Sequence, residues 1–315
     1  MFTFVAAKQK PLIIPVFIPH LGCKKLCAFC NQRDVTGVTE PTLEDVENAV
    51  KSYLSWSKPR ERTEISFYGG TFTALPREKM MNYIRKGAEF VENGTVNALR
   101  CSTRPDEIDE ERVEILKNNY FETVELGVQS MSEKLLGKMR RGHSAKCVEK
   151  ATELLKNAGI SVGLQFMTGF PGETEEDIEV SCASLSVLKP DFIRIYPFVP
   201  LKNTPVFNDL EAGRVKMESA ETILERTAAL FLAAMRLKIP VIRIGLPQSD
   251  DVPSVYPENL FQVVVAKAIE RLAEEGERDF VIPESFVTSF NMARRKIAFS
   301  IQSTIISPCS FGVWK

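Results

Sequence analysis

The chain has 315 residues, of which 44% are hydrophobic and 26% charged, and its net charge is -1. This composition excludes disordered, collagenous and coiled-coil chains, and the charge balance excludes a strongly basic coat for nucleic acid. No apolar run reaches the roughly 18 residues that a membrane span needs, and residues 1–10 lack a cleavable leader pattern. We therefore expect a cytoplasmic protein with no membrane contact.

Six short β-rich runs alternate with helical patterns along the first 200 residues. The predicted strands span 12–18, 64–68, 96–102, 123–128, 162–167 and 192–198. The predicted helices span 43–56, 77–91, 110–118, 132–139, 145–157 and 175–188. Parallel strands need helical crossovers of this length, so the alternation predicts an α/β fold with a parallel sheet covered by helices.

The pattern changes after residue 200. A long helix is expected at 216–237, a short β-type run at 241–244, a loop at 248–259 and a helix at 260–275, whereas 303–315 has no readable period. We therefore predict a core domain at 12–200 and a mostly helical C-terminal extension at 201–315 that packs on it.

Three of the seven cysteines lie close together, at Cys23, Cys27 and Cys30, and the other four are scattered. A disulfide framework would not have this pattern, which favours one metal-type cluster in a reducing compartment. The cysteines follow the first predicted strand, at the end of the sheet where α/β proteins place their chemistry.

The spacing of these cysteines leaves the bound metal open. Structural zinc needs four protein ligands, and His20 is a candidate for the fourth. Alternatively, a 4Fe–4S cluster held by three cysteines keeps one iron free for a substrate or cofactor. The third possibility is three buried cysteines without a ligand.

The segment Cys23–Cys30, with C-x3-C-x-aromatic-C spacing after the first strand, resembles the signature of radical S-adenosylmethionine (radical SAM) enzymes. Residues 18–32 are most similar to the branch with the elongator catalytic subunit and the oxygen-independent coproporphyrinogen oxidases. The resemblance covers residues 12–200 and implies a partial (β/α)6 TIM-like barrel. It also implies that the three cysteines bind a 4Fe–4S cluster and that Phe29 packs beside the adenine of SAM.

Further motifs of the family follow the second and third strands in order. Gly69, Gly70 and Thr71 resemble the glycine-rich turn that binds the methionine amino group, although a plain tight turn is the simpler interpretation. Ser102 and Arg104 belong to an STRPD motif and are candidates for contacts to SAM or to an anionic substrate. A capped loop before the next helix is the alternative.

The fourth and fifth strands end in further candidates for SAM binding. Gln129 resembles a SAM-contacting residue, and Arg141 matches an arginine that pairs with the SAM carboxylate, as a two-pronged guanidinium can. A solvated basic pair is the alternative for Arg141. Gln165 lies where relatives bond the SAM ribose, and His143 is either a helix-start residue or a proton carrier.

The resemblance implies a reaction but no substrate. A reduced cluster cleaves SAM to methionine and a 5′-deoxyadenosyl radical, which takes a hydrogen atom from the substrate. An electron donor such as flavodoxin or ferredoxin is the implied partner. Because the elongator subunit modifies tRNA, RNA is one candidate substrate beside a porphyrinogen, a peptide or a small metabolite. We expect no acetyltransferase domain, since only about 115 residues follow the barrel.

A non-catalytic, cysteine-rich zinc- or RNA-binding module on an α/β scaffold is the competing function. Such a module has no need of Gly69 and Gly70, Arg141 and Gln165 at successive strand ends. The order of the motifs therefore favours the enzyme.

Overall fold

The computed structural model describes residues 1–5, 11–24, 26–31, 40–246, 253–297 and 300–306. Each of the six strands and six helices predicted before residue 200 overlaps an observed element, with bounds within two residues of those predicted. The described strands are β1 (Phe2–Thr3), β2 (Leu12–Phe17), β3 (Thr63–Tyr68), β4 (Ala98–Thr103), β5 (Phe121–Gln129), β6 (Ser161–Thr168), β7 (Phe192–Pro197), β8 (Val241–Ile244), β9 (Asp279–Pro283) and β10 (Gln302–Ile306). The described α-helices are α2 (Leu43–Trp56), α3 (Arg77–Glu92), α4 (Glu110–Lys117), α5 (Glu133–Lys138), α6 (Ala145–Asn157), α7 (Glu175–Leu188), α8 (Pro205–Glu211), α9 (Ala220–Arg236), α10 (Leu260–Glu274) and α11 (Val287–Arg294).

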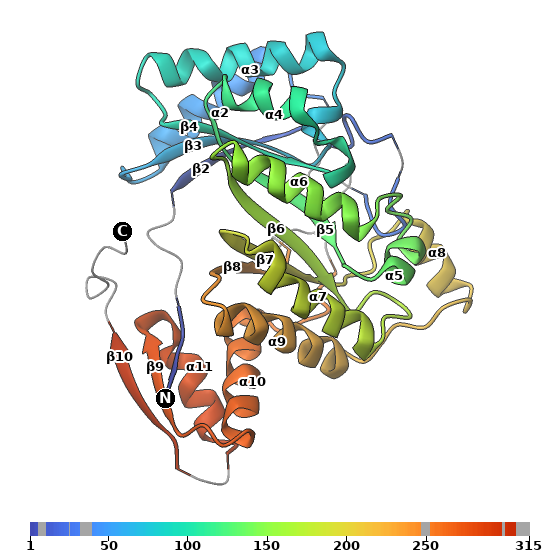
Figure 1. Cartoon of the computed structure of the whole chain (residues 1–315), viewed down its shortest axis with the longest axis vertical. Coiled ribbons are helices and arrows are strands. Elements are labelled where there is room, and N and C mark those ends of the chain that lie inside the picture. Colours follow the sequence, from blue (N-terminus) through green and yellow to red (C-terminus); the bar gives the residue numbers. More distant parts are fainter. Residues whose placement is uncertain (6–10, 25, 32–39, 247–252, 298–299, 307–315) are drawn as a thin grey trace.

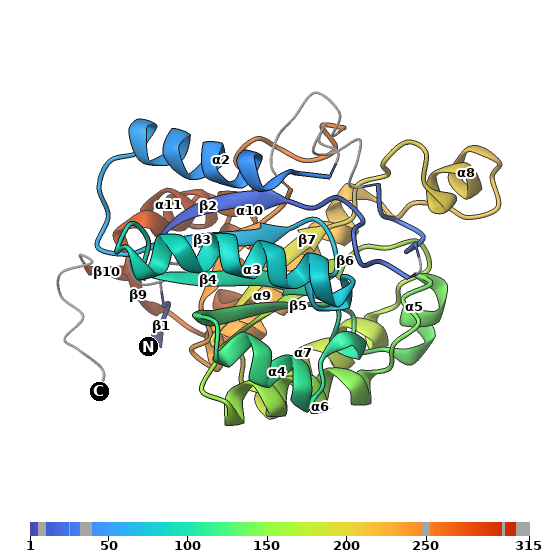
Figure 2. The same ribbon diagram turned by 90° about the horizontal axis from the view of Figure 1, so that it is seen from above.

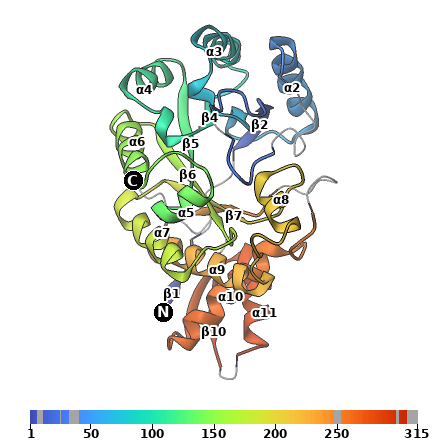
Figure 3. The same cartoon turned by 90° about the vertical axis from the view of Figure 1, so that its right-hand side faces the viewer.

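Seven parallel strands form the main sheet in the order β2-β3-β4-β5-β6-β7-β8. The sheet curls, and helices α3, α4, α6, α7 and α9 lie outside the arc of strands (Figures 1 and 3). The α/β fold class and the partial TIM-like barrel expected from the sequence are therefore confirmed.

Local sequence signals explain where the helices begin and which strand face is apolar. Thr42 and Thr174 cap α2 and α7, each with an aspartate that completes a capping box. On β3, Ile65 and Phe67 are fully buried in the main hydrophobic core, whereas Glu64 lines the concave side. This alternation leaves the inner face of the barrel to polar side chains.

The sheet continues past residue 200, because β8 pairs with β7 in parallel. β8 was expected only as a short β-type run, and nothing in four residues indicates which strand they join. The division of the chain near residue 200 stays a prediction. None of the described helices combines the length and the apolar character that crossing a bilayer requires.

A second, three-stranded parallel sheet joins the two ends of the chain in the order β1-β9-β10. It lies with α10 and α11 at one end of the molecule (Figures 1 and 3), which is the end farther from the viewer in Figure 2. Phe4 follows β1 and is fully buried. The sequence predicted neither β1, β9 and β10 nor α8 and α11. Residues 248–252 of the loop expected at 248–259, and residues 307–315 of the tail expected at 303–315, lie outside the described residues.

Candidate functional site

A cavity of about 1740 Å³ lies on the concave face of the main sheet. The residues that the family resemblance assigns to the cluster or to SAM all line this one cavity, whereas His20, the candidate fourth ligand for zinc, is not among its lining residues. The assigned residues are Cys23, Cys27, Phe29, Cys30, Gly69, Gly70, Thr71, Ser102, Arg104, Gln129, Arg141 and Gln165. The fold thus brings together side chains from a loop and four strand ends that are up to 142 positions apart, the separation of Cys23 and Gln165.

The cysteine loop leaves β2 through two left-handed residues. His20 has φ 57° and Gly22 has φ 75°. A Cβ atom on Gly22 would lie 2.2 Å from the carbonyl oxygen of Thr71, so only glycine fits there. The loop is therefore pressed directly against the turn that follows β3.

The Gly69-Gly70-Thr71 turn holds the cysteine loop through its backbone. The Thr71 N–H donates to the Leu21 carbonyl at 2.8 Å, and Thr71 Oγ1 lies 3.2 Å from Cys23 Sγ. A Cβ atom on Gly70 would lie 2.5 Å from the carbonyl oxygens of Ile18 and Leu21. The close approach of the two backbones therefore explains why glycine is needed at position 70. The turn Gly69–Thr71 also lines the cavity.

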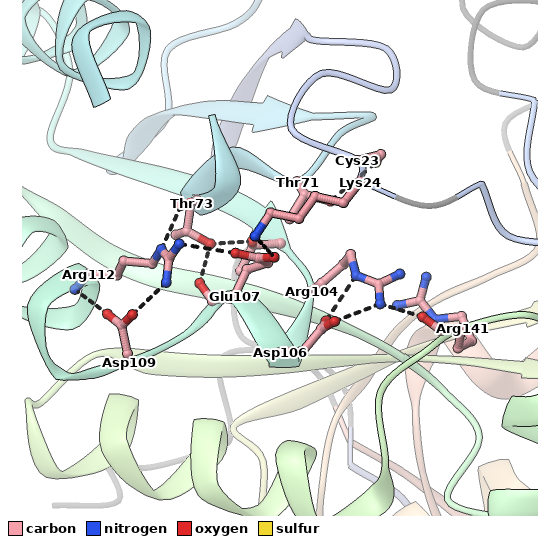
Figure 4. Close-up of polar contacts among 11 residues, drawn as sticks. Cys23, Lys24, Thr71, Thr73, Arg104, Asp106, Glu107, Asp109, Arg112 and Arg141 are labelled. Atoms are coloured by element: carbon pink, nitrogen blue, oxygen red, sulfur yellow. Dashed lines mark hydrogen bonds and ion pairs between the residues drawn. The ribbon is translucent and has the colours of Figure 1, made fainter. Parts of the chain in front are cut away.

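Two arginines face the sulfur of Cys27. Nη1 of Arg141 donates to Cys27 Sγ at 2.9 Å, and Nη1 of Arg104 is 4.0 Å from the same sulfur. Arg104 also forms a two-pronged pair with Asp106 and donates to the Arg141 carbonyl (Figure 4). Arg141 is only 5% exposed, so it is not part of a solvated basic pair, although Arg140 beside it is exposed.

An ion pair anchors the other side of the cysteine loop. Lys24 Nζ lies 2.7 Å from Glu107, which follows β4 and is also contacted by Arg112 (Figure 4). The Glu107 carbonyl accepts a hydrogen bond from Thr73 at 2.6 Å. These contacts connect the loop to the ends of two neighbouring strands.

The three thiols fit an iron–sulfur cluster. The six described cysteines form no disulfide, and burial raises the pKa of Cys23, which favours its neutral thiol when no ligand is bound. Among the described residues, no three His, Cys, Asp or Glu side chains converge as the ligands of a single ion must. In a 4Fe–4S cluster each thiolate binds a different iron, so the three sulfurs surround the cluster and need not meet at a single ion. Nearby guanidiniums favour the negative charge of such a group.

Neither His20 nor His143 is among the residues that line the cavity. His20 Nε2 lies 3.6 Å from Cys30 Sγ. His143 is 7% exposed, and burial lowers its pKa to about 3, so its ring stays neutral near pH 7. Ser144, rather than His143, caps α6. A charged proton carrier at His143 is therefore not supported.

The ends of β5 and β6 place the two glutamines of the site. Gln129 has φ 70°, a conformation that only a few per cent of non-glycine residues adopt, and it ends β5 at a register shift. Nε2 of Gln165 donates to Glu125 Oε2 at 2.8 Å and to Ser102 Oγ at 3.3 Å. Ser102 and Gln165 therefore belong to one polar cluster in the wall of the cavity.

Gln165 contacts a buried network of ion pairs that was not predicted from the sequence. Glu125 pairs with Arg194 at 2.7 Å and with Arg100 at 3.1 Å, and Arg100 pairs with Glu64 at 2.7 Å. Burial alone would raise the pKa of Glu125, but the two arginines outweigh it and hold the pKa below its ordinary value. Charged residues within otherwise apolar strands were the available signal.

Phe29 is positioned by aromatic neighbours from a later loop. Its ring meets Phe170 edge to face with the centroids 6.3 Å apart, and Phe170 in turn meets Phe198 at 5.5 Å. Edge-to-face pairs of aromatic rings are more stable than the burial of their apolar surface area alone would make them, so they help to fix the orientation of Phe29. Phe29 is partly buried in this small hydrophobic cluster and still lines the cavity.

The chain matches the family model described as the Radical SAM superfamily over residues 17–185, which is more than half of its length. It belongs to this superfamily, whose members use a 4Fe–4S cluster and SAM. The resemblance to the elongator and coproporphyrinogen oxidase branches is confirmed by relatives and structural neighbours from both.

Curated relatives include proteins of archaea and bacteria. An uncharacterized protein of Methanocaldococcus jannaschii is 32% identical over 62% of this chain and 64% of its own. A tRNA uridine(34) acetyltransferase of Methanocaldococcus infernus is 27% identical over 65% of this chain and 42% of its own. A heme chaperone HemW of Lactococcus lactis is 23% identical over 68% of this chain and 56% of its own. The chain thus spans less than two thirds of these relatives.

Solved structures with the same fold include an N-terminally truncated archaeal Elp3 from Methanocaldococcus infernus. It has a TM-score of 0.64 at 20% identity and covers 86% of this chain and 65% of its own. The queuine lyase from Clostridium spiroforme has a TM-score of 0.55 at 14% identity and covers 80% of this chain and 98% of its own. At these identities the likeness establishes the fold.

Proposed function

We propose that this chain is a radical SAM enzyme in which Cys23, Cys27 and Cys30 hold the 4Fe–4S cluster. The observation that carries the proposal is the position of the cysteine loop. All three side chains line the cavity, and two guanidiniums face the sulfur of Cys27. A negatively charged cluster on three thiolates is stabilised by such neighbours.

Different residues around the cysteine loop bind different groups of SAM. When bound, the cluster and SAM supply a 5′-deoxyadenosyl radical through one-electron cleavage of the C5′–S bond, and this radical takes a hydrogen atom from the substrate. We assign the methionine amino group to the turn Gly69–Thr71. Arg141 is assigned to the methionine carboxylate, because its Nε is buried without a hydrogen-bond partner among the described residues.

The remaining candidates contribute the adenosine side of the site. Phe29 offers a flat apolar ring to the adenine. Ser102, Gln129 and Gln165 offer hydroxyl and amide groups to the ribose, and Arg104 supports the loop through Cys27 and Asp106. The protein's share of the chemistry is to orient these groups and to exclude water from the cavity.

The substrate and its partners belong to the proposal as well. A reductant such as flavodoxin or ferredoxin supplies the electron, and a reducing cytoplasm keeps the thiols available. RNA is one candidate substrate, supported by the relative whose name assigns it to tRNA uridine. The overall reaction is then an oxidoreduction or a group transfer.

Anaerobic reconstitution tests this function. The protein is loaded with iron and sulfide and reduced with dithionite, and its electron paramagnetic resonance spectrum is recorded with and without SAM. We expect a 4Fe–4S signal that shifts when SAM is added. The signal should be absent from Cys27→Ala and retained in Cys182→Ala, since Cys182 lies on α7 and does not line the cavity.

Two results would overturn the proposal. Binding of stoichiometric zinc, with no assembly of iron and sulfide, would favour the metal-binding module. A cluster signal that Cys27→Ala leaves intact would place the metal elsewhere.

A further inference from the structure

The cavity carries a large excess of positive charge. Eight arginine and lysine side chains line it, against three carboxylates, Glu64, Glu125 and Asp191, which leaves five positive charges in a chain whose net charge is -1. A concave surface lined by one sign of charge concentrates the electrostatic field toward its interior. The cavity is therefore suited to an anionic ligand.

Ion pairing neutralises most of the lining arginines. Arg62, Arg100, Arg104 and Arg194 each have a carboxylate oxygen within 2.8 Å. In the part of the chain that the structure describes, Arg141 and Arg243 have no carboxylate at ion-pair distance. These two guanidiniums account for positive charge that the protein itself leaves uncompensated.

The expected cofactors do not supply the missing negative charge. An oxidised 4Fe–4S cluster with three thiolates carries about -1, and SAM carries about +1 from its sulfonium, amino and carboxylate groups, so the two nearly cancel. The proposed function already assigns Arg141 to the SAM carboxylate. Arg243 then has no carboxylate partner, either among the described residues or in the two cofactors.

Arg243 is held in position on the inner face of the sheet. It lies on β8 directly beside Arg194 on β7, and paired residues of neighbouring strands point to the same side. Its Nε donates to the Gly245 carbonyl at 2.9 Å, which fixes the guanidinium. The side chain is half-buried and lines the cavity. Its terminal nitrogens remain available to a ligand.

Arg194 adds polar groups next to this guanidinium. Both its Nε and its Nη2 are committed to Glu125, and Nη2 also lies 3.3 Å from the Tyr68 hydroxyl. Arg194 therefore has little charge left to offer, whereas Arg243 offers a full one. A planar guanidinium in this setting favours a carboxylate or a phosphate, each of which it can bond with two prongs.

We propose that Arg243, with Arg194 beside it, forms a subsite for the acidic group of the substrate, a carboxylate or a phosphate. This inference rests on the proposed function, because it takes the cysteine end of the cavity as the SAM site. It assigns the substrate to the class of anionic molecules and places its acidic end against β7 and β8.

Calorimetric titration of the reconstituted full-length protein tests the subsite. SAM is present, so that the region of Arg141 is occupied, and inorganic pyrophosphate or succinate is titrated at low ionic strength. We expect the wild-type protein to bind one probe more tightly, which identifies the phosphate or the carboxylate as the preferred group. The affinity should fall roughly tenfold or more in Arg243→Gln and less in Arg243→Lys.

Matched controls separate this inference from the proposed function. Arg214→Gln, an exposed arginine outside the cavity that is paired with Asp209, should bind the probe as the wild type does. The shift of the wild-type cluster signal on adding SAM, measured on the same sample, reports on the proposed function without reference to Arg243. Probe binding that is equal in wild type and Arg243→Gln, or absent from the wild type, would overturn the subsite.

A crystal of the wild-type protein soaked in selenate provides a second measurement if the variants do not fold. We expect an anomalous selenium peak at hydrogen-bond distance from the Arg243 guanidinium. Selenate bound only at Arg141 or on the outer surface would contradict the subsite.

Discussion

Individual glycines decide whether the cysteine loop can reach its position. Gly22 and Gly70 lie where a Cβ atom would overlap backbone atoms, at 2.2 Å from Thr71 and at 2.5 Å from Leu21. Backbone cannot move aside as a flexible side chain can, so substitution must displace the loop or the turn after β3. Since Cys23 lies in that loop, local packing and metal binding are coupled.

Gly70→Ala should destabilise the protein by about 1–3 kcal/mol, because the added methyl group overpacks a contact between two backbones. Urea unfolding measures the loss. Gly137→Ala is the matched control, since nothing lies within 4 Å of the corresponding Cβ position on α5. That change should be neutral or stabilising by up to about 1 kcal/mol, because alanine favours a helix. Equal effects of the two substitutions would refute the close-contact argument.

At the scale of the strands, the charges on the inner face alternate in sign along β3, β4 and β5. Glu64 on β3, Arg100 on β4 and Glu125 on β5 form a continuous chain of ion pairs, which Arg194 on β7 completes. Glu64, Arg100 and Glu125 pair between neighbouring strands, and Arg194 reaches Glu125 across β6, so the network stabilises one particular register of the sheet. Removal of one member leaves its partners buried without full compensation.

Glu125→Gln should lower the free energy of unfolding by about 3–5 kcal/mol, because Arg100 and Arg194 lose a shared counter-charge inside the barrel. Thermal and urea unfolding measure the change. Glu122→Gln is the control, since this residue pairs with Arg62 on the surface and its side chain is 56% exposed. Its effect should stay within about 1 kcal/mol. A small effect of Glu125→Gln would mean that water solvates the network.

The turn between β6 and α7 contains a buried acid with a raised pKa. Burial raises the pKa of Glu173 from 4.5 to about 8, although the Gly169 N–H donates to it at 2.6 Å and Arg226 lies 3.7 Å away. The folded protein therefore binds more protons than the unfolded chain between these two values. Stability should fall as the pH rises through this window, by at most about 1.4 kcal/mol per pH unit.

Glu173→Gln should flatten this pH dependence, because glutamine cannot titrate and still accepts the Gly169 N–H. Urea unfolding at pH 5, 6.5 and 8 compares the variant with the wild type and with Glu179→Gln, an exposed position on α7. The control should keep the wild-type slope. A wild-type slope in Glu173→Gln would assign the pH dependence to other groups.

For the whole molecule, the first residues of the chain connect the small sheet to the barrel. Phe4 is fully buried, and its ring lies 6.4 Å from Phe231 on α9 and 5.7 Å from Phe286. Phe231 belongs to the helix that covers β7, while β1 pairs with β9. The N-terminal segment thus packs simultaneously against both parts of the fold.

Phe4→Ala should reduce the free energy of unfolding by about 3–5 kcal/mol, because it leaves a cavity among aromatic rings at this junction. Urea unfolding is again the measurement. Trp56→Ala is a suitable control, since Trp56 is 79% exposed at the end of α2, and its effect should be within about 0.5 kcal/mol. A cost below about 1 kcal/mol for Phe4→Ala would show that the junction contributes little.

The alternating strands and helices before residue 200, and the cysteine loop, could be recognised from the amino-acid sequence alone. These features are local. Helical periodicity, capping by Thr42 or Thr174, and three cysteines between Cys23 and Cys30 need no distant partner to be recognised. The candidate cofactor residues were identified because they lie in short motifs that resemble those of radical SAM enzymes, and such motifs are local as well.

The contacts between distant residues became known from the three-dimensional arrangement of the strands. A two-residue strand such as β1 has no period, and it is a strand only because β9 lies beside it. Likewise, Glu125 and Arg194 pair across the curled sheet, and Arg243 gained a role only when β8 was seen beside β7. Strand pairing and charge compensation depend on contacts between residues far apart in the chain, and no local pattern encodes these contacts.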